Sequence, residues 1–385
     1  MRVEKMVRQL VEGCSEVVHV ARLAAVVKVV EGIVSGGRLS PATIGRNLEG
    51  TARPKHGIKC VDRLLGSPHM VKDRLFIFLA IAHHLLRGCA RPVILVDWTH
   101  TGGTHEALVA AVPIGGRALP IYVEVHPLKK LGNAAVEKRF LCALKAILPS
   151  ECRSIIVSDA GFKGPFFQAV RELGWDFLGR VRGTAKAVSY DGRTISKEEF
   201  YQRASITPTD LGTFGLFVKQ HIPCRLVLVR KRRKPGRRPP PPKCKEEREL
   251  RQSALDPWLL ATSLSEGDAG YVVSLYAKRM QIEETFRDAK NHRFGWSLGG
   301  VQLSTTQRMA TLLVLAALAL AVITLVGMGA ERRGVHRAYQ ANTQRKRALS
   351  FFVLACAIIR RGDLDQRSLE DFAISLAFIP QAASA

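Results

Sequence analysis

Three acidic residues carry the chemistry that this sequence suggests. Asp97 and Asp159 each end an apolar run that is typical of a buried β-strand, at residues 92–97 and 154–159. Glu283 lies in a segment whose pattern is helical. Carboxylate oxygens are the ligands that Mg²⁺ prefers in proteins, and paired metal ions promote displacement at phosphorus. The three carboxylates therefore suggest divalent metal ions acting on a polyanion.

The net charge of the chain favours nucleic acid as the polyanion. Among its 385 residues there are 58 Lys and Arg against 33 Asp and Glu, which gives a formal net charge of +25. Such an excess attracts polyanions at long range and gains from the release of their counterions. Together with the acidic residues, the charge points to phosphodiester chemistry on nucleic acid.

Glu283 has aromatic and basic neighbours at helical spacing. They are Tyr276, Arg279, Arg287 and Lys290. At about 100° per residue, these five side chains of a continuous helix share one stripe roughly 80° wide. An amphipathic helix with a solvated charged side would show the same spacing. The two aspartates elsewhere in the chain favour the other interpretation, in which Glu283 is a metal ligand among phosphate-binding cations.

Residues 1–88 predict a helical DNA-binding domain. Ser40 and Pro41 are typical of the N-cap and first turn of a short helix, and a second helix follows at residues 55–65. The basic side chains at every fourth position of the second helix are Lys55, Lys59 and Arg63. Two such helices suit a helix-turn-helix-like contact with DNA, whereas a small packed bundle with a solvated basic face is the alternative.

The fold class predicted for the chain is α/β. Residues 89–182 show three strands, a helix, a fourth strand, a second helix and a last strand, which is the order of a ribonuclease-H-like domain. Residues 183–270 predict a β-rich insertion into that domain. Residues 271–330 complete its core with two helices, and residues 331–385 predict a helical C-terminal region.

Two segments admit more than one interpretation. Residues 230–251 carry 11 basic and three acidic residues together with a run of prolines. This composition opposes a packed core and predicts a loop that either holds a DNA backbone or stays solvated. Residues 309–330 are 22 uncharged residues, long enough to span a bilayer. Their alanine content and their position after a charged helix favour a buried central helix.

Other patterns exclude several classes of function. The eight cysteines show no C-x-x-C pairing, so neither a zinc framework nor a secreted disulfide scaffold is indicated. Reduced thiols and the lack of an evident signal peptide predict a cytoplasmic protein. No G-x4-G-K-[ST] loop is present, so the use of ATP is not indicated.

The chain resembles DDE transposases of bacterial insertion sequences, in the group marked by Tyr-x2-Arg-x3-Glu-x6-Lys (insertion sequence family four). The signature matches at every spacing, from Tyr276 to Lys290. Three further segments resemble that group's second-aspartate motif, the segment after it and its insertion strand: residues 158–162, 174–183 and 257–262. The resemblance covers residues 35–330.

This resemblance implies a cut-and-paste enzyme that acts on double-stranded DNA. Such an enzyme binds terminal inverted repeats, nicks the transposon ends and joins them to target DNA, through hairpin ends in some relatives. Asp97, Asp159 and Glu283 would coordinate two Mg²⁺ ions, for which Mn²⁺ is expected to substitute. The residues that would hold phosphates near the cleaved end are Tyr276, Arg279, Lys290 and, as a further backbone contact, Arg287.

The resemblance also bears on Trp258 and on assembly. In hairpin-forming relatives a tryptophan in this setting stacks on a base flipped out of the duplex, whereas a core tryptophan is the competing interpretation. Family members act as dimers on paired ends, so a homodimer is expected. The expected location is the bacterial cytoplasm at the nucleoid, and not a membrane. A catalytically inactive DNA-binding relative and a ribonuclease-H-type nuclease are the alternatives.

Overall fold

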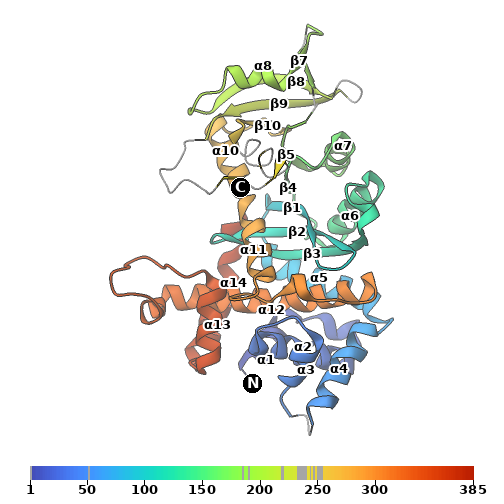
Figure 1. The fold of residues 1–385 in the computed structure, drawn as a ribbon, viewed down its shortest axis with the longest axis vertical. Coiled ribbons are helices and arrows are strands. Elements are labelled where there is room, and N and C mark those ends of the chain that lie inside the picture. The colour runs from blue at the N-terminus through green and yellow to red at the C-terminus, as the bar shows by residue number, and fades with distance from the viewer. Residues whose placement is uncertain are drawn as a thin grey trace. The chain divides into compact units, whose positions relative to one another are not determined.

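The computed structural model describes most of the chain, and its described residues form two compact units. The described residues are 2–50, 53–183, 186–189, 191–217, 221–231, 241–242, 244–245, 248 and 255–385. Unit 1 comprises Met1–Cys152 and Met280–Ala385, and unit 2 comprises Arg153–Arg279. Both contain helices and strands, so the predicted α/β fold class is confirmed (Figure 1). Most of the basic tract predicted at residues 230–251 lies outside the described residues.

Unit 1 begins with helices, as predicted. They are α1 (Arg2–Leu10), α2 (Val20–Gly36), α3 (Pro41–Arg46), α4 (Pro54–Gly66) and α5 (Met70–Leu86). Ser40 caps α3, since its hydroxyl accepts a hydrogen bond from the amide of Thr43. The helices α3 and α4 approach closely at a glycine pair, because a Cβ at Gly57 would lie 2.1 Å from the carbonyl oxygen of Gly45. Small residues therefore fix the two short helices against each other.

The three-stranded meander of unit 1 also matches the prediction. Its antiparallel strands are β1 (Val93–His100), β2 (His105–Ile114) and β3 (Arg117–Pro127), followed by α6 (Ala134–Ile147). The turn between β2 and β3 uses Gly115 and Gly116 at φ 56° and 91°, a region that glycine enters without strain. One detail differs from the prediction, because β1 continues three residues beyond Asp97.

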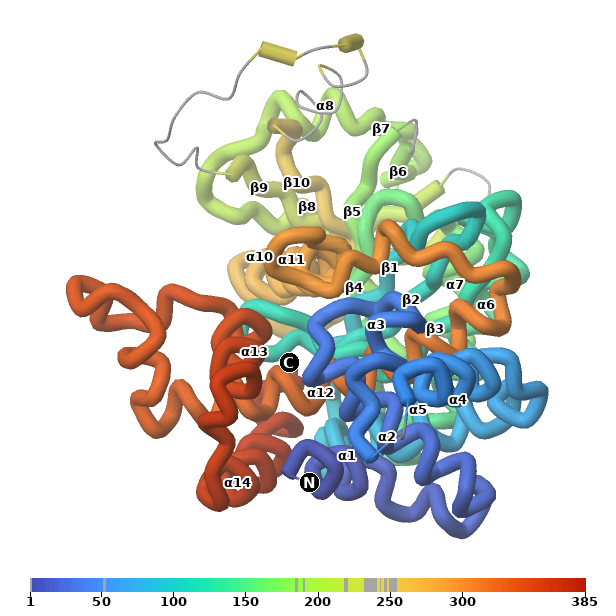
Figure 2. Tube along the Cα trace, turned by 60° about the horizontal axis from the view of Figure 1, so that its bottom comes forward, coloured from blue at the N-terminus to red at the C-terminus, as the bar shows by residue number. Residues whose placement is uncertain are grey.

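The remaining helices of unit 1 pack around one apolar helix. They are α11 (Met280–Lys290), α12 (Thr306–Arg332), α13 (Phe351–Arg361) and α14 (Gln366–Ala383). The helix α12 contacts β3 and the helices α2, α4, α5, α13 and α14, and Figure 2 shows it among the N-terminal helices. It is long and apolar enough to cross a membrane, yet 94% of its most apolar window is buried. The prediction of a buried central helix is therefore confirmed.

Unit 2 is built on a mixed sheet. Its strands, in spatial order, are β4 (Ile155–Ser158), β5 (Asp176–Arg180), β10 (Trp258–Thr262), β9 (Ile222–Val229), β8 (Thr209–Leu216), β6 (Lys186–Val188) and β7 (Thr194–Ser196). Only β4 and β5 are parallel among the described pairs of this unit. Its described helices are α7 (Gly164–Glu172), α8 (Lys197–Gln202) and α10 (Ala269–Ala277). The β-rich segment thus continues the sheet that β4 and β5 begin, because β10 joins β5 to β9.

Burial divides the cysteines into reactive and protected thiols. Five are buried, Cys60 is half-buried, and Cys142 and Cys244 are exposed. Burial raises the pKa of Cys14 to about 11 and that of Cys152 to about 12, so these thiols stay protonated near neutral pH.

A thiol reagent should therefore modify Cys142 and Cys244 rapidly in the native protein. Cys60 should follow more slowly, and the five buried thiols should react only after unfolding. Mass spectrometry of time points with a disulfide reagent, compared with the same protein in guanidinium chloride, measures this. Modification of Cys152 in the native protein at the rate of Cys142 would contradict the described core.

Candidate active site and DNA-contact residues

The first predicted carboxylate, Asp97, lies on β1 beside a basic side chain. Asp97 is half-buried and pairs in register with Val109 of β2. The ammonium of Lys290, on α11, donates to the hydroxyl of Thr99 at 2.7 Å. Burial lowers the pKa of Lys290, and the negative charges of Glu106 and Asp97 oppose that shift. The structure thus brings together Asp97 and Lys290, two of the predicted site residues, although they are far apart in the sequence.

Glu283 belongs to the same unit and lies on the helix that carries Lys290. The helix α11 packs against β1, β2 and β3 and buries Ile282 and Thr285. Glu283 and Arg287 are exposed. At about 100° per residue, Glu283, Arg287 and Lys290 fall within roughly 60° of one another around the helix axis, as predicted. One face of α11 therefore presents a carboxylate between two basic residues.

The prediction of one continuous helix from Tyr276 to Lys290 is wrong. The helix α10 ends at Ala277, and α11 begins at Met280. The amides of Lys278 and Arg279 bond to the carbonyl oxygens three residues earlier, at 3.1 and 3.0 Å, so the last turn tightens and the α-helical pattern stops. The common stripe predicted for five residues consequently holds only for the three on α11.

Tyr276 and Arg279 lie in unit 2, where they form a second group with Asp159 and Trp258. Tyr276 is 3% exposed, and its ring meets that of Trp258 edge-on at 4.8 Å between centroids. Burial raises the pKa of the Tyr276 phenol, Arg279 lowers it, and the charge of Asp159 raises it further. Tyr276 is thus a buried contact of this group and does not share the stripe that the sequence predicted for it with Glu283.

Asp159 directly follows β4, as predicted. Its Oδ1 accepts a hydrogen bond from the amide of Gly161 at 2.8 Å, which fixes the turn after the strand. The neighbouring strand β5 runs parallel, with Gly179 opposite Ser158. A Cβ at Gly179 would lie 2.5 Å from the ring of Phe167, so glycine is needed for the close approach of α7 to β5.

Two arginines of unit 2 join this group and were not among the predicted site residues. Burial lowers the pKa of Arg180, and the positive charge of Arg182 lowers it further. Tyr276 acts on the pKa of Arg180 in the opposite direction. The Arg180 guanidinium donates to the carbonyl oxygens of Asp256 and Pro257, directly before Trp258, at 3.0 and 3.3 Å. The sequence pattern that could have identified both arginines is their alternation around Val181, because residues two apart on an extended segment face the same side.

Trp258 is buried. Its side chain lies on β10 and is 6% exposed. Tyr276 covers its ring from the edge, and the ammonium of Lys231 lies 3.8 Å from the ring centroid. The stacking role predicted for Trp258 stays a prediction, and it requires Lys231 to leave the ring face to a base.

The basic residues of α4 form one exposed stripe. Taking Lys55 as zero, Lys59 and Arg63 lie at about 40° and 80°, whereas the buried residues lie at about 180° to 280°: Gly57, Val61, Leu64 and Leu65. Lys55, Lys59 and Arg63 are all exposed. The arrangement suits contact with a DNA backbone, and the DNA contact itself stays a prediction.

The acidic set matches the chemistry of a divalent metal ion. Asp97 and Glu283 belong to unit 1 and Asp159 to unit 2. Within either unit, no group of three or more His, Cys, Asp or Glu side chains among the described residues is arranged to hold a metal. Asp97 and Asp159 are half-buried and Glu283 is exposed, and all three offer the hard oxygen donors that Mg²⁺ requires. Their convergence on a shared metal site stays a prediction.

Comparison with known proteins gives the family. The model of the transposase DDE domain matches residues 89–321, which is more than half of the chain and includes all three acidic residues. No curated protein matches the chain. DDE transposases are polynucleotidyl transferases that cut and join DNA, and they generally use divalent metal ions. The chain therefore belongs to the DDE transposase family.

Proposed function

We propose that this transposase cuts transposon ends at terminal inverted repeats and transfers them to target DNA by cut-and-paste, as a member of insertion sequence family four. One observation carries the proposal: in unit 1, Asp97 on β1 lies near Lys290 on α11. The helix α11 also bears Glu283. The order of strands and helices from β1 to β5 supports a ribonuclease-H-like catalytic core. The net charge of +25 supports double-stranded DNA as the partner.

In this proposal the acidic residues act together. Asp97, Asp159 and Glu283 would hold two Mg²⁺ ions. When bound, the metal would supply activation of the attacking water or 3′-hydroxyl and stabilisation of the leaving oxygen, and Mn²⁺ would substitute for it. The carboxylates fix the position of the attacking oxygen relative to the scissile phosphate. Within its own unit each side chain is already oriented by a hydrogen bond, Asp159 by the amide of Gly161 and Lys290 by the hydroxyl of Thr99.

The basic residues bind phosphates on either side of the cut. In unit 1 these residues are Lys290 and Arg287. In unit 2 they are Arg279, whose neighbour is Tyr276, together with Arg180 and Arg182. Lys290 is suited to this role because its ammonium is held by Thr99 near Asp97, which places a cation beside the charge that develops on the phosphate. A homodimer on paired ends, in the bacterial cytoplasm at the nucleoid, completes the proposal.

The test of this function is cleavage of DNA from the flanks of the protein's own gene. Labelled duplexes that contain each end are incubated with the protein in Mg²⁺, in Mn²⁺ and in chelator. We expect nicks at the ends with either metal and none with chelator. Binding without cleavage in both metals would instead identify an inactive relative. Cleavage of RNA–DNA hybrids with no preference for the ends would identify a nuclease.

The basic stripe of α4 gives a prediction about end binding. Replacing Lys55, Lys59 and Arg63 together by Gln should weaken binding of end DNA. It should also reduce the slope of log K against log salt by about 2 to 3, since each lost phosphate contact contributes about 0.9. Fluorescence anisotropy across a salt series measures the slope. The control is a triple variant with the same loss of charge, in which Arg8, Arg139 and Arg367 are replaced by Gln. An equal change of slope in both triple variants would contradict a DNA contact at α4.

A further inference from the structure

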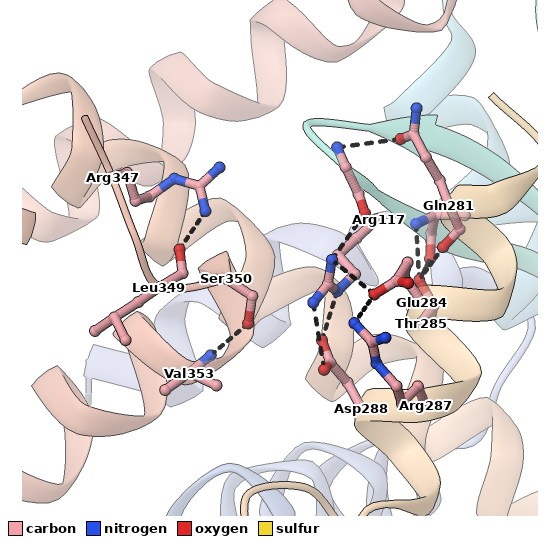
Figure 3. A network of polar contacts seen from close by, with 12 residues as sticks. Arg117, Gln281, Glu284, Thr285, Arg287, Asp288, Arg347, Leu349, Ser350 and Val353 are labelled. Carbon is pink, nitrogen blue, oxygen red and sulfur yellow. Dashed lines mark hydrogen bonds and ion pairs between the residues drawn. The ribbon is translucent and has the colours of Figure 1, made fainter. Parts of the chain in front are cut away.

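The turn between β2 and β3 is attached to α11 by a set of polar contacts, which we call the hairpin clamp. Its members are Gly116, Arg117 and Ala118 of the hairpin and Gln281, Glu284, Thr285 and Asp288 of α11. The Nε of Arg117 donates to Asp288 at 2.6 Å, and its Nη2 to the second carboxylate oxygen at 3.4 Å. Figure 3 shows these side chains converging between the hairpin and the helix.

Backbone groups of the hairpin complete the clamp. The amide of Gly116 donates to the side chain of Gln281 at 3.2 Å. The amide of Ala118 donates to the hydroxyl of Thr285 at 2.8 Å, and that hydroxyl lies 3.0 Å from the Ala118 carbonyl oxygen. The ion pair is shielded, because Arg117 and Asp288 are only 17% and 14% exposed. Shielded, bidentate pairs hold their geometry better than solvated ones.

The hairpin clamp contacts α11 on the side of the helix away from Glu283. At about 100° per residue and with Glu283 as zero, the clamp residues of α11 lie between about 100° and 200°. Arg287 and Lys290 lie near 40° and 340° on the same scale. Glu284 links the clamp to that face, since it pairs with Arg117 at 3.8 Å and also with Arg287. The clamp therefore sets the rotation of α11 about its axis through contacts on the side away from Glu283.

We propose that Arg117 is a positioning residue for catalysis, which acts by fixing the rotation of α11 and so the place of the Glu283 carboxylate. The inference rests on the proposed metal-binding role of Glu283. A rotation of α11 by about 20° would move a group about 5 Å from its axis by roughly 1.7 Å. Displacements of about 1 Å are enough to cost about a hundredfold in rate when reacting groups must be aligned.

Residues of the C-terminal region pack against the turn between β2 and β3. A Cβ at Gly115 would lie 2.3 Å from the ring of Phe351, at the start of α13, so this residue packs directly on the turn. The guanidinium of Arg347 lies 3.9 Å from the centroid of the same ring and pairs with Glu331 at 2.9 Å. The hairpin is consequently held between α13 and α11, and movement of the turn is restricted on both sides.

The experiment compares Arg117→Ala and Arg117→Lys with a matched control, Arg333→Ala. Arg333 directly follows α12 and forms an ion pair with Asp371 of α14 at 2.6 Å, also within unit 1 and with similar exposure. Each full-length variant is assayed for melting temperature, affinity for end DNA and cleavage rate at saturating DNA over a range of Mg²⁺ concentrations. Guanidinium ion at millimolar concentration is added to Arg117→Ala, and Glu283→Gln is included as a reference.

We expect Arg117→Ala to cleave about tenfold to a hundredfold more slowly at saturating DNA and to need more Mg²⁺, while its affinity for ends stays within about twofold. Arg117→Lys should recover to within about fivefold of wild type, because it keeps the charge but not the bidentate geometry. Guanidinium should restore part of the rate of Arg117→Ala, and Arg333→Ala should cleave within about twofold of wild type.

Two results would overturn the inference. One is an Arg117→Ala variant that cleaves like Arg333→Ala at every Mg²⁺ concentration. The other is a loss of cleavage that only follows a loss of folding and is restored by neither lysine nor guanidinium. If Glu283→Gln remains inactive in these assays, the proposed function survives and only the role of Arg117 is lost. Cleavage by Glu283→Gln would instead remove the proposed function itself.

Discussion

Glu283→Gln is expected to lower Mg²⁺-dependent cleavage of transposon ends by about a thousandfold or more. The amide matches the carboxylate in shape but lacks the negative charge that a bound cation needs. Metal stabilisation of a phosphoryl transition state is worth several kcal/mol, and each 1.36 kcal/mol is about tenfold in rate. Because Glu283 is exposed and lies on the face of α11 opposite the hairpin clamp, the fold should tolerate the change.

The measurement separates catalysis from binding. End affinity by anisotropy should stay within about twofold of wild type, while nicked product on a denaturing gel falls to background. Asp97→Asn should behave alike. Glu370→Gln is the control, because it replaces an exposed glutamate on α14 of the same unit and should leave cleavage unchanged. Nicking by Glu283→Gln at the wild-type rate would show that its carboxylate holds no essential metal.

Local patterns in the sequence were sufficient to predict most of the elements that carry the candidate site. Apolar runs that end at Asp97 and Asp159 predicted β1 and β4, and Ser40 with Pro41 predicted the start of α3. Burial of α12 on all sides followed from its uniform apolar composition. These features depend on residues close together in the chain, which is why sequence patterns reveal them.

Features that depend on distant residues could not be predicted in this way. Arg117 and Asp288 are 171 residues apart, and no local pattern links them. The break between α10 and α11 follows three-residue hydrogen bonds at Lys278 and Arg279, where no proline or glycine marks a boundary. The burial of Tyr276 depends on its packing against Trp258 of β10, which the helical spacing of the signature does not indicate.

Trp258→Ala is expected to destabilise unit 2 strongly. Trp258 is 6% exposed on a strand between β5 and β9, and removal of a buried tryptophan costs about 3–5 kcal/mol. At roughly 2–4 °C per kcal/mol, the melting temperature should fall by roughly 6 to 20 °C. Circular dichroism measures the transition, and hydrogen exchange at β9 and β10 should show that the loss is in this sheet.

The control for this prediction is Ile206→Ala in the same unit. Its side chain is 56% exposed, so the change should cost no more than about 0.5 kcal/mol. Trp258→Phe, which keeps an aromatic ring against Tyr276, should lose much less stability than the alanine variant. Equal melting of Trp258→Ala and Ile206→Ala would contradict a core role for this side chain.

Trp258→Leu separates a core role from the proposed stacking on a flipped base. Leucine keeps apolar volume in the sheet but removes the aromatic face, and base–aromatic stacking is worth about 1–3 kcal/mol. We therefore expect the first nick to proceed near the wild-type rate and hairpin formation at the end to slow by about tenfold. The ammonium of Lys231 now lies 3.8 Å from the ring centroid, so a base can stack there only by displacing it. Hairpins that form as fast in Trp258→Leu as in wild type would mean that Trp258 serves the core alone.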